Sequence, residues 1–228
     1  MNLLAIDTST PRASVVLAVG DHLHLAPPHQ ADGGRHGRQL LPTIAGLLGS
    51  AGVRPHSIDA IAVGLGPGSY TGLRVGLTAA KTLAFALGKP LVGIDSFAAA
   101  AWNAPVEART IQVIGDAQRG DLYVEGFART EPDPIVRSLG PIQVLEMTTW
   151  AATLPPGTWV LGAALDRLRI DWPAHVHLGT TDQGHPSPPA LVAIGSEAAR
   201  AGRFVDPATI EPTYIRRSAA EDQWDRRV

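Results

Sequence analysis

The sequence predicts an α/β protein with two lobes that are built alike, and the repeat of one short pattern carries this prediction. An apolar run of residues 3–6 stops at Asp7, and a second β-rich run follows six positions after that aspartate. Asp116 precedes the apolar residues 122–124 by the same six positions. Between the two copies, a strand, a glycine-rich loop, a helix and a strand follow in the order typical of α/β folds. The pattern favours a duplicated fold of the kind that opens both lobes of actin-like, hexokinase-like ATPases over two unrelated hairpins.

The elements of the first half follow from apolar spacing and from turn residues. Pro42 falls in the first turn of the first predicted helix, where proline is tolerated. The predicted elements are a hairpin of residues 3–6 and 13–19, a helix over 39–50, a strand over 60–63, a glycine-rich loop over 64–72, a helix over 73–87 and a strand over 91–94.

The second half predicts a second lobe with fewer clear signals. Its expected elements are strands at 110–114 and 122–127, loops at 131–141, 154–157 and 183–189, and a helix over 190–201. We therefore divide the chain into an N-terminal lobe of residues 1–104 and a C-terminal lobe of residues 105–228. The last helix is expected to pack back towards the first lobe, and the mixed-charge tail from residue 216 is expected to be disordered.

Composition excludes several classes of function. The 228 residues include no cysteine, which excludes a disulfide scaffold, a cysteine-based zinc site and a cysteine nucleophile. With 19 basic and 21 acidic residues, the chain has no broad positive field for strong unaided binding to nucleic acid. The first apolar run is too short for a signal peptide, and no uncharged stretch resembles a membrane span. We expect a cytoplasmic protein that contacts no membrane.

Two loops are candidates for phosphate binding. The glycine-rich loop offers backbone N–H groups at a helix N-terminus, but it lacks the lysine of a P-loop, and a structural strand-to-helix turn is the simpler interpretation. Ser9 stands where a glycine would let a phosphate approach closely, so Asp7 is expected to cap its own turn. The candidate residues of these vestigial phosphate loops are Asp7, Thr8, Ser9, Gly66, Gly68, Ser69, Thr71, Gly72 and Asp116.

Histidine pairs and catalytic motifs give no positive signal. His22 and His24, like His175 and His177, are two residues apart and face the same way on a strand, but no third ligand is near either pair in the sequence. No G-x-S-x-G elbow or other activated nucleophile is present. The sequence therefore indicates neither a metal site nor a catalytic centre.

The helix predicted over residues 73–87 is apolar almost all round, interrupted by Arg74, Thr78, Lys81 and Thr82. Such a helix must be covered on more than one side. Two interpretations are open: its own chain supplies all of the cover, or this helix and the one over 39–50 present a helical pair to a partner.

Several segments together resemble the bacterial TsaB family, formerly YeaZ. The resemblance covers nearly the whole chain, densely over the first hundred residues and thinly over 128–208, and its most specific stretch is GPGSYTG followed by LRVG at 66–76. The matching segments are residues 3–9, His36 with 40–42, 64–76, 89–94, 116–123 and 212–216. Residues 37–39 depart from the family pattern, which usually has a hydroxyl residue after the histidine.

The resemblance implies a role in making threonylcarbamoyladenosine in transfer RNAs that read codons beginning with A. It implies a non-catalytic subunit without a cofactor, which pairs with its paralogue TsaD, the enzyme that transfers the threonylcarbamoyl group to the tRNA adenosine. A small ATPase, TsaE, joins the pair, and tRNA is contacted only through the complex. TsaD-like enzymes bind metal through an HxxxH motif after the strand at 91–94, where this chain has Ser96 and Ala100. The resemblance thus argues against transferase and metallopeptidase activity in this chain alone.

The expected partner surface is a four-helix interface that could also join two copies of this chain when TsaD is absent. The alternative hypothesis is a small ATPase or phosphotransferase that uses the loops of Asp7 and Asp116. The residues expected at the partner interface are Leu40, Leu41, Ile44, Leu73, Arg74, Leu77, Thr78 and Lys81.

Overall fold

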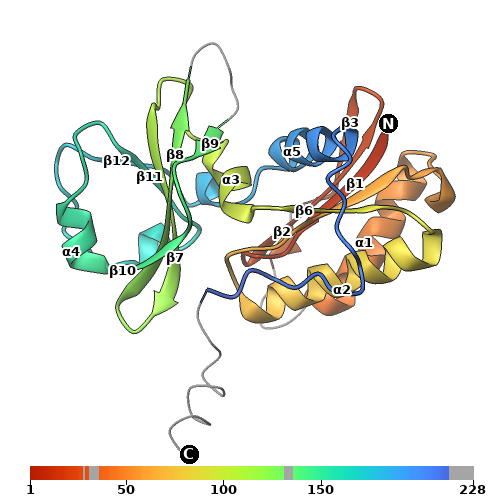
Figure 1. Cartoon of the computed structure of the whole chain (residues 1–228), viewed down its shortest axis with the longest axis horizontal. Helices are drawn as coiled ribbons and strands as arrows, with labels where there is room; N and C mark the ends of the chain where they lie inside the picture. Colours follow the sequence, from red (N-terminus) through yellow and green to blue (C-terminus); the bar gives the residue numbers. More distant parts are fainter. Residues whose placement is uncertain (28, 31–35, 131–135, 216–228) are drawn as a thin grey trace, which may run out of the picture.

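The computed structural model describes residues 1–27, 29–30, 36–130 and 136–215, and it confirms the two-lobed α/β fold (Figure 1). Each lobe is built on one mixed sheet that opens with an antiparallel hairpin. The expected disorder from residue 216, and residues 131–135 of the loop expected over 131–141, lie outside the described residues. Among the described residues, no helix is both long enough and apolar enough to cross a bilayer.

The first sheet has the strand order β3-β2-β1-β5-β6, with β4 also paired to β2. β1 is antiparallel to β2 and parallel to β5, and β5 is parallel to β6. Both faces of β1 are buried, which explains its unbroken apolar run. The strands are β1 (Asn2–Asp7), β2 (Arg12–Val19), β3 (His22–Leu25), β4 (His29–Gln30), β5 (Ala60–Gly64) and β6 (Leu91–Ile94).

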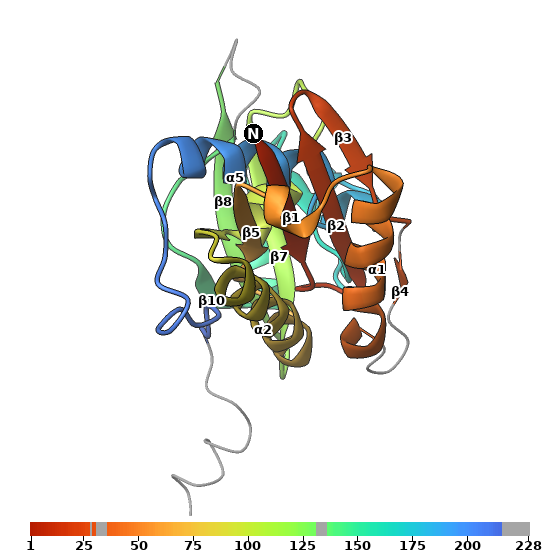
Figure 2. The ribbon, with the colours of Figure 1, turned by 90° about the vertical axis from the view of Figure 1, so that its right-hand side faces the viewer.

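Helices cover both faces of this sheet. α1 (His36–Ser50) and α2 (Tyr70–Leu87) lie side by side on one face, and α5 (Pro188–Arg200) covers the other (Figures 1 and 2). The helix predicted near residue 190 is therefore present, and it contacts β1, β2, β5 and β6. The first lobe is consequently assembled from both halves of the chain.

α1 begins three residues earlier than the apolar spacing predicts. Because its first residue is His36, Pro42 lies in the second turn and not in the first. The short 3-10 helix η1 (Pro55–Ser57) leads from α1 to β5.

The second sheet has the order β10-β8-β7-β11-β12, with β9 paired to β8. β9 and the strands after it carry no clear alternation and were not predicted, and β9 replaces part of the loop expected over 131–141. The strands are β7 (Thr110–Gln118), β8 (Asp121–Arg129), β9 (Val136–Ser138), β10 (Gln143–Glu146), β11 (Trp159–Leu161) and β12 (His177–Leu178). Helix α4 (Met147–Ala152) follows β10, and the 3-10 helices η2 (Leu165–Arg167) and η3 (Asp182–Gly184) lie in the later loops.

Helix α3 (Ser96–Ala101) lies between the lobes and belongs to the cores of both (Figure 1). Ala99 packs in the core beneath α5, whereas Phe97, Ala100 and Ala101 pack against β7, β8 and β11 of the second sheet. The two lobes thus meet through a shared apolar helix.

α2 is fixed tightly at its N-terminal end. The Ser69 hydroxyl caps the helix by accepting a hydrogen bond from Gly72 N at 3.2 Å. A Cβ atom at Gly72 would overlap Thr8 O, and one at Gly76 would overlap Thr8 Oγ1. These two glycines let the helix touch the loop that follows β1.

We predict that Gly72→Ala lowers the free energy of unfolding by at least about 2 kcal/mol, because the new methyl group meets a backbone oxygen that cannot rotate away. Gly46→Ala is the matched control, since a Cβ there meets nothing within 4 Å, and it should gain about 0.5–1 kcal/mol from helix propensity. Urea unfolding of both variants measures the difference. Equal stabilities would contradict the close approach.

Candidate functional site

The loop after β1 holds Asp7 in a closed hydrogen-bond network. Asp7 is buried, and its Oδ1 accepts hydrogen bonds from Ser9 N at 2.8 Å and Ser9 Oγ at 2.6 Å. Its Oδ2 accepts from Ser96 Oγ at 2.6 Å. Burial raises the pKa of Asp7, and these hydrogen bonds oppose the rise. The carboxyl group caps its turn and ties the loop to α3.

The glycine-rich loop is packed against this turn. Ser69 N donates to Ser9 O at 2.7 Å, and Thr8 Oγ1 donates to Gly72 O at 2.7 Å. A Cβ at Gly68 would overlap Ser9 O, and one at Gly64 would overlap the Asp7 carboxylate. The glycines therefore serve the contact between the two loops, as the structural interpretation of the sequence predicts.

A cleft of about 580 Å³ separates the two lobes beside these loops. Its walls include Asp116, whose Oδ1 accepts a hydrogen bond from Gln118 N at 2.7 Å, and Tyr123 of β8. No lysine, arginine or histidine is among the described residues that line it. Polyphosphate transfer depends on positive charge around the phosphates. Of the candidate phosphate-loop residues, Ser9, Gly68, Ser69, Thr71 and Asp116 line this cleft, whereas Asp7, Thr8, Gly66 and Gly72 do not.

Ser96 and Ala100, which stand where a TsaD-like enzyme would have its metal ligands, have structural roles in this chain. Ser96 donates to Asp7, and Ala100 is buried in the core beneath the second sheet. His175 bonds Leu154 O at 2.9 Å through Nε2, and His177 stacks on Trp159. In the part of the chain that the structure describes, no three His, Cys, Asp or Glu side chains are grouped to hold a metal ion.

Half of the residues expected at the partner interface lie in the protein's own core. Burial corrects the prediction for Leu40, Ile44, Leu73 and Leu77, which are 2–5% exposed. These side chains point inward because α1 packs on β2 and α2 packs on β5 and β1. Leu41, Arg74 and Thr78 are exposed, and Lys81 is half-buried.

Arg74 and Lys81 have partners within the chain that the sequence did not reveal. After α5 the chain runs along β6 and α2 (blue in Figure 1), where Lys81 Nζ donates to Ile210 O at 3.2 Å. Arg74 Nε donates to Tyr214 Oη at 2.9 Å, and the Arg74 guanidinium lies 4.1 Å from the ring centroid of Tyr70. This C-terminal segment, residues 202–215, has no periodic pattern that could have predicted its path.

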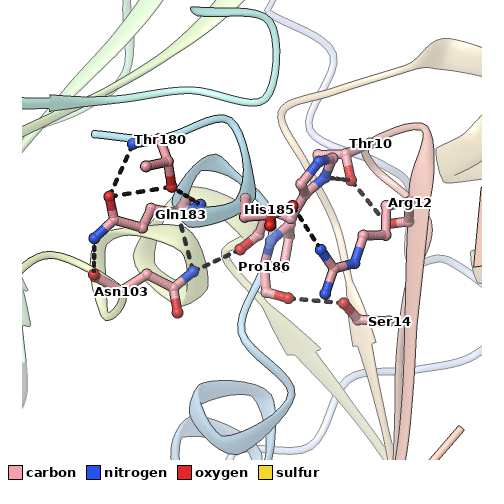
Figure 3. Close-up of polar contacts among 9 residues, drawn as sticks. Thr10, Arg12, Ser14, Asn103, Thr180, Gln183, His185 and Pro186 are labelled. Atoms are coloured by element: carbon pink, nitrogen blue, oxygen red, sulfur yellow. Dashed lines mark hydrogen bonds and ion pairs between the residues drawn. The ribbon is translucent and has the colours of Figure 1, made fainter. Parts of the chain in front are cut away.

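A polar junction joins the lobes at one end of the cleft (Figure 3). Two residues of β2 contact the segment around η3. Arg12 forms an ion pair with Asp182 at 2.9 Å, and Ser14 Oγ donates to Pro186 O at 2.7 Å. On the other side, Asn103 Nδ2 donates to the carbonyl oxygens of Gln183 and His185. The segment around η3 is thereby held to β2 and to the chain just after α3.

His185 lies at the centre of this junction. Thr10 Oγ1 donates its proton to Arg12 O, so it must accept from His185 Nδ1, which lies 2.8 Å away. The network therefore assigns the proton to Nδ1. Burial first, and then the charge of Arg12, lower the pKa of His185 below its ordinary value. The neutral imidazole is the form that fits the junction.

The fold and the site define a class first: this is a two-lobed α/β protein, in which each lobe has one mixed sheet of the same strand pattern and a cleft lies between the lobes. The family model described as TsaD, tRNA N6-adenosine threonylcarbamoyltransferase, matches residues 28–131. The chain is 30% identical to the tRNA threonylcarbamoyladenosine biosynthesis protein TsaB of Bacillus subtilis over 98% of both chains. It is 34% identical to TsaB of Escherichia coli over 58% of this chain and 57% of that one.

A solved structure agrees with these relatives. YeaZ from Pseudomonas aeruginosa superposes with a TM-score of 0.79 at 27% identity, covering 94% of this chain and 99% of that one. The chain belongs to the TsaB (YeaZ) family, which takes part in the biosynthesis of threonylcarbamoyladenosine in tRNA.

We predict that the lobe junction weakens in acid. Because the pKa of His185 is lower in the folded protein, the unfolded chain binds more protons as the pH falls below about 6.5, and the stability present above that pH is lost. His185→Asn keeps a donor near the Nδ1 position without titrating, so its melting temperature should fall less between about pH 7 and pH 5. His56→Asn, at an exposed histidine, is the control. A wild-type acid profile in His185→Asn would contradict the assignment.

Proposed function

We propose that this protein is a non-catalytic subunit that binds a TsaD transferase through α1 and α2 and is required for threonylcarbamoyl transfer to tRNA adenosine. The observation that carries the proposal is a pair of helices, α1 and α2, whose outward faces are exposed. In the same chain, Ser96 and Ala100 stand where a TsaD-like enzyme would have its metal ligands. Both positions serve the protein's own structure. The likeness of residues 28–131 to the TsaD family model supports a paralogous partner.

The outward face of α2 supports binding of a helical partner. Arg74, Thr78, Thr82 and Phe85 follow at helical spacing and are all exposed, with Phe85 88% exposed. A large aromatic side chain left in water at the surface of a helix is suited to a protein interface.

α1 adds a surface of small residues beside one exposed leucine. Leu41 is 52% exposed, and a Cβ atom added at Gly46 or Gly49 would meet nothing within 4 Å. Small side chains let a second pair of helices approach closely and form a four-helix interface. The same face would join two copies of this chain when TsaD is absent.

Charge supports contact with tRNA only through the complex. The net charge is -2, which leaves the chain without a general attraction to a phosphate backbone. TsaE is proposed as the further ATPase component of the assembly because the resemblance to the TsaB family implies it. The cleft of this chain has no basic group among its described lining residues. The same feature argues against a phosphotransferase activity of its own.

We predict that omission of this chain abolishes threonylcarbamoylation in a reaction reconstituted with TsaD, TsaE, threonylcarbamoyl-adenylate and tRNA. The chain alone should give no product, because it supplies no catalytic group. The measurement is the modified nucleoside in digested tRNA. Full activity without the chain would overturn the proposal.

We also predict that Leu41→Glu combined with Thr78→Glu weakens binding to TsaD at least about tenfold, because the interface would bury unpaired charges. Isothermal titration calorimetry measures the affinity. Val106→Glu, on the second lobe at a position 76% exposed, is the matched control and should bind normally. Unchanged binding by the double variant would place the interface elsewhere.

A further inference from the structure

Two acidic side chains from different lobes, Asp95 and Glu125, lie close together near the N-terminus of α3. Asp95 follows β6 of the first sheet and caps α3, with its Oδ1 accepting from Phe97 N at 2.7 Å and Ala98 N at 3.3 Å. Glu125 lies in β8 of the second sheet, on the face that carries Tyr123 and Phe127 towards α3, and is only 4% exposed. Both line a cavity of about 490 Å³ that Thr213 of the C-terminal segment also borders.

A hydrogen bond joins the two carboxyl groups. A carboxylate can only accept, so a hydrogen bond between two of them requires a proton on one. Two ionised carboxylates within hydrogen-bonding reach of each other and shielded from water would repel each other strongly. The pair in this structure therefore holds one proton and one negative charge.

The surroundings assign the proton to Glu125. Burial raises the pKa of Asp95 as well, but the hydrogen bond with Glu125 and the two backbone N–H groups at the start of α3 oppose the rise and favour the anion of Asp95. Glu125 has a side-chain hydrogen bond with Ser138, which lowers its pKa, but its buried Oε2 meets no N–H or hydroxyl donor. Burial first, and the charge of Asp95 second, raise the pKa of Glu125 to about 8. Glu125 is the donor and Asp95 the acceptor.

The residues beside the pair that line the cavity are uncharged or acidic. The strand β9 contributes Ser138, and the C-terminal segment contributes Thr213, neither of which carries charge at ordinary pH. The other acid nearby is Asp7, which Ser96 links to the same turn and whose pKa is also raised, first by burial and least by Asp95. The described residues that line the cavity include no lysine, arginine or histidine.

We propose that the proton shared by Glu125 and Asp95 is a pH-sensitive lock between the two lobes, whose loss in mild alkali loosens their contact across α3. The lock is independent of the proposed partner role, because both acids lie away from α1 and the exposed face of α2. It is the counterpart of the His185 junction, which weakens in acid.

The test compares melting temperature across about pH 6 to 9.5 for the full chain and for Glu125→Gln. A carboxyl whose pKa is raised on folding contributes its full stabilisation below its unfolded pKa of 4.5, and the contribution declines progressively until the pH has risen through the folded pKa of about 8. The glutamine keeps a neutral donor to Asp95 but does not titrate. We expect a fall of several degrees in the wild type and a flat profile in Glu125→Gln. Glu211→Gln, at an exposed acid, is the control and should follow the wild type.

A second variant keeps the proposal testable if Glu125→Gln does not fold. Asp95→Ser retains a side chain suited to capping α3 and removes the negative charge beside Glu125, so the alkaline transition should shrink and move to higher pH or disappear.

A direct readout is the infrared carbonyl band of protonated carboxyl groups, followed at neutral pH. A band present in the wild type and lost in Glu125→Gln supports the lock. Its absence from the wild type, or a wild-type alkaline transition in Glu125→Gln, would overturn it.

Discussion

The rest of the structure depends on the contact between the turn after β1 and the first turns of α2. Thr8 and Ser9 receive the backbone of the glycine-rich loop at distances that no side chain on Gly68 or Gly72 would permit. That contact fixes the start of α2, and the orientation of α2 decides which of its faces packs in the core. It also closes the turn around Asp7, so that a buried carboxyl that does not line the cleft becomes a structural group.

The two lobes are joined on both sides of α3 by groups that titrate in opposite directions. At the η3 segment a neutral histidine is surrounded by hydrogen-bond partners and an arginine, so added protons are unfavourable. At the Asp95 and Glu125 pair, the removal of a proton is unfavourable. Because α3 shares its apolar residues with both cores, a disturbance at either junction acts on the same short helix. Near neutral pH, His185 is therefore neutral and Glu125 is protonated, so both junctions are in their bonded forms.

Periodicity predicted the fold and most elements of the first lobe because the apolar pattern there is strong and local. It could not decide which apolar side chains of α1 and α2 face a partner. Leu41 is exposed while its neighbour Leu40 is buried, and the difference depends on where the sheet lies and not on residue type. The C-terminal segment and the Asp95 and Glu125 contact depend on residues far apart in the chain, for which one sequence carries no pairing signal. The glycine-rich loop was predicted as a structural strand-to-helix turn, and its glycines do pack closely against the turn after β1.

The same geometry explains why the metal-binding positions of a related enzyme can be absent without loss of the fold. Ser96 uses its hydroxyl to hold the Asp7 turn and to accept a hydrogen bond from Gly66 N at 3.0 Å, and Ala100 leaves room for the packing of α3 on the second sheet. A histidine at Ser96 would replace a small hydroxyl in a buried network that two loops share. Ala100 packs in the core of the second lobe and also borders the cleft between the lobes. Both positions now contribute to stability. Histidines at both positions would thus require the hydrogen-bond network around Asp7 to change, which is consistent with a chain whose proposed role is to bind a catalytic partner.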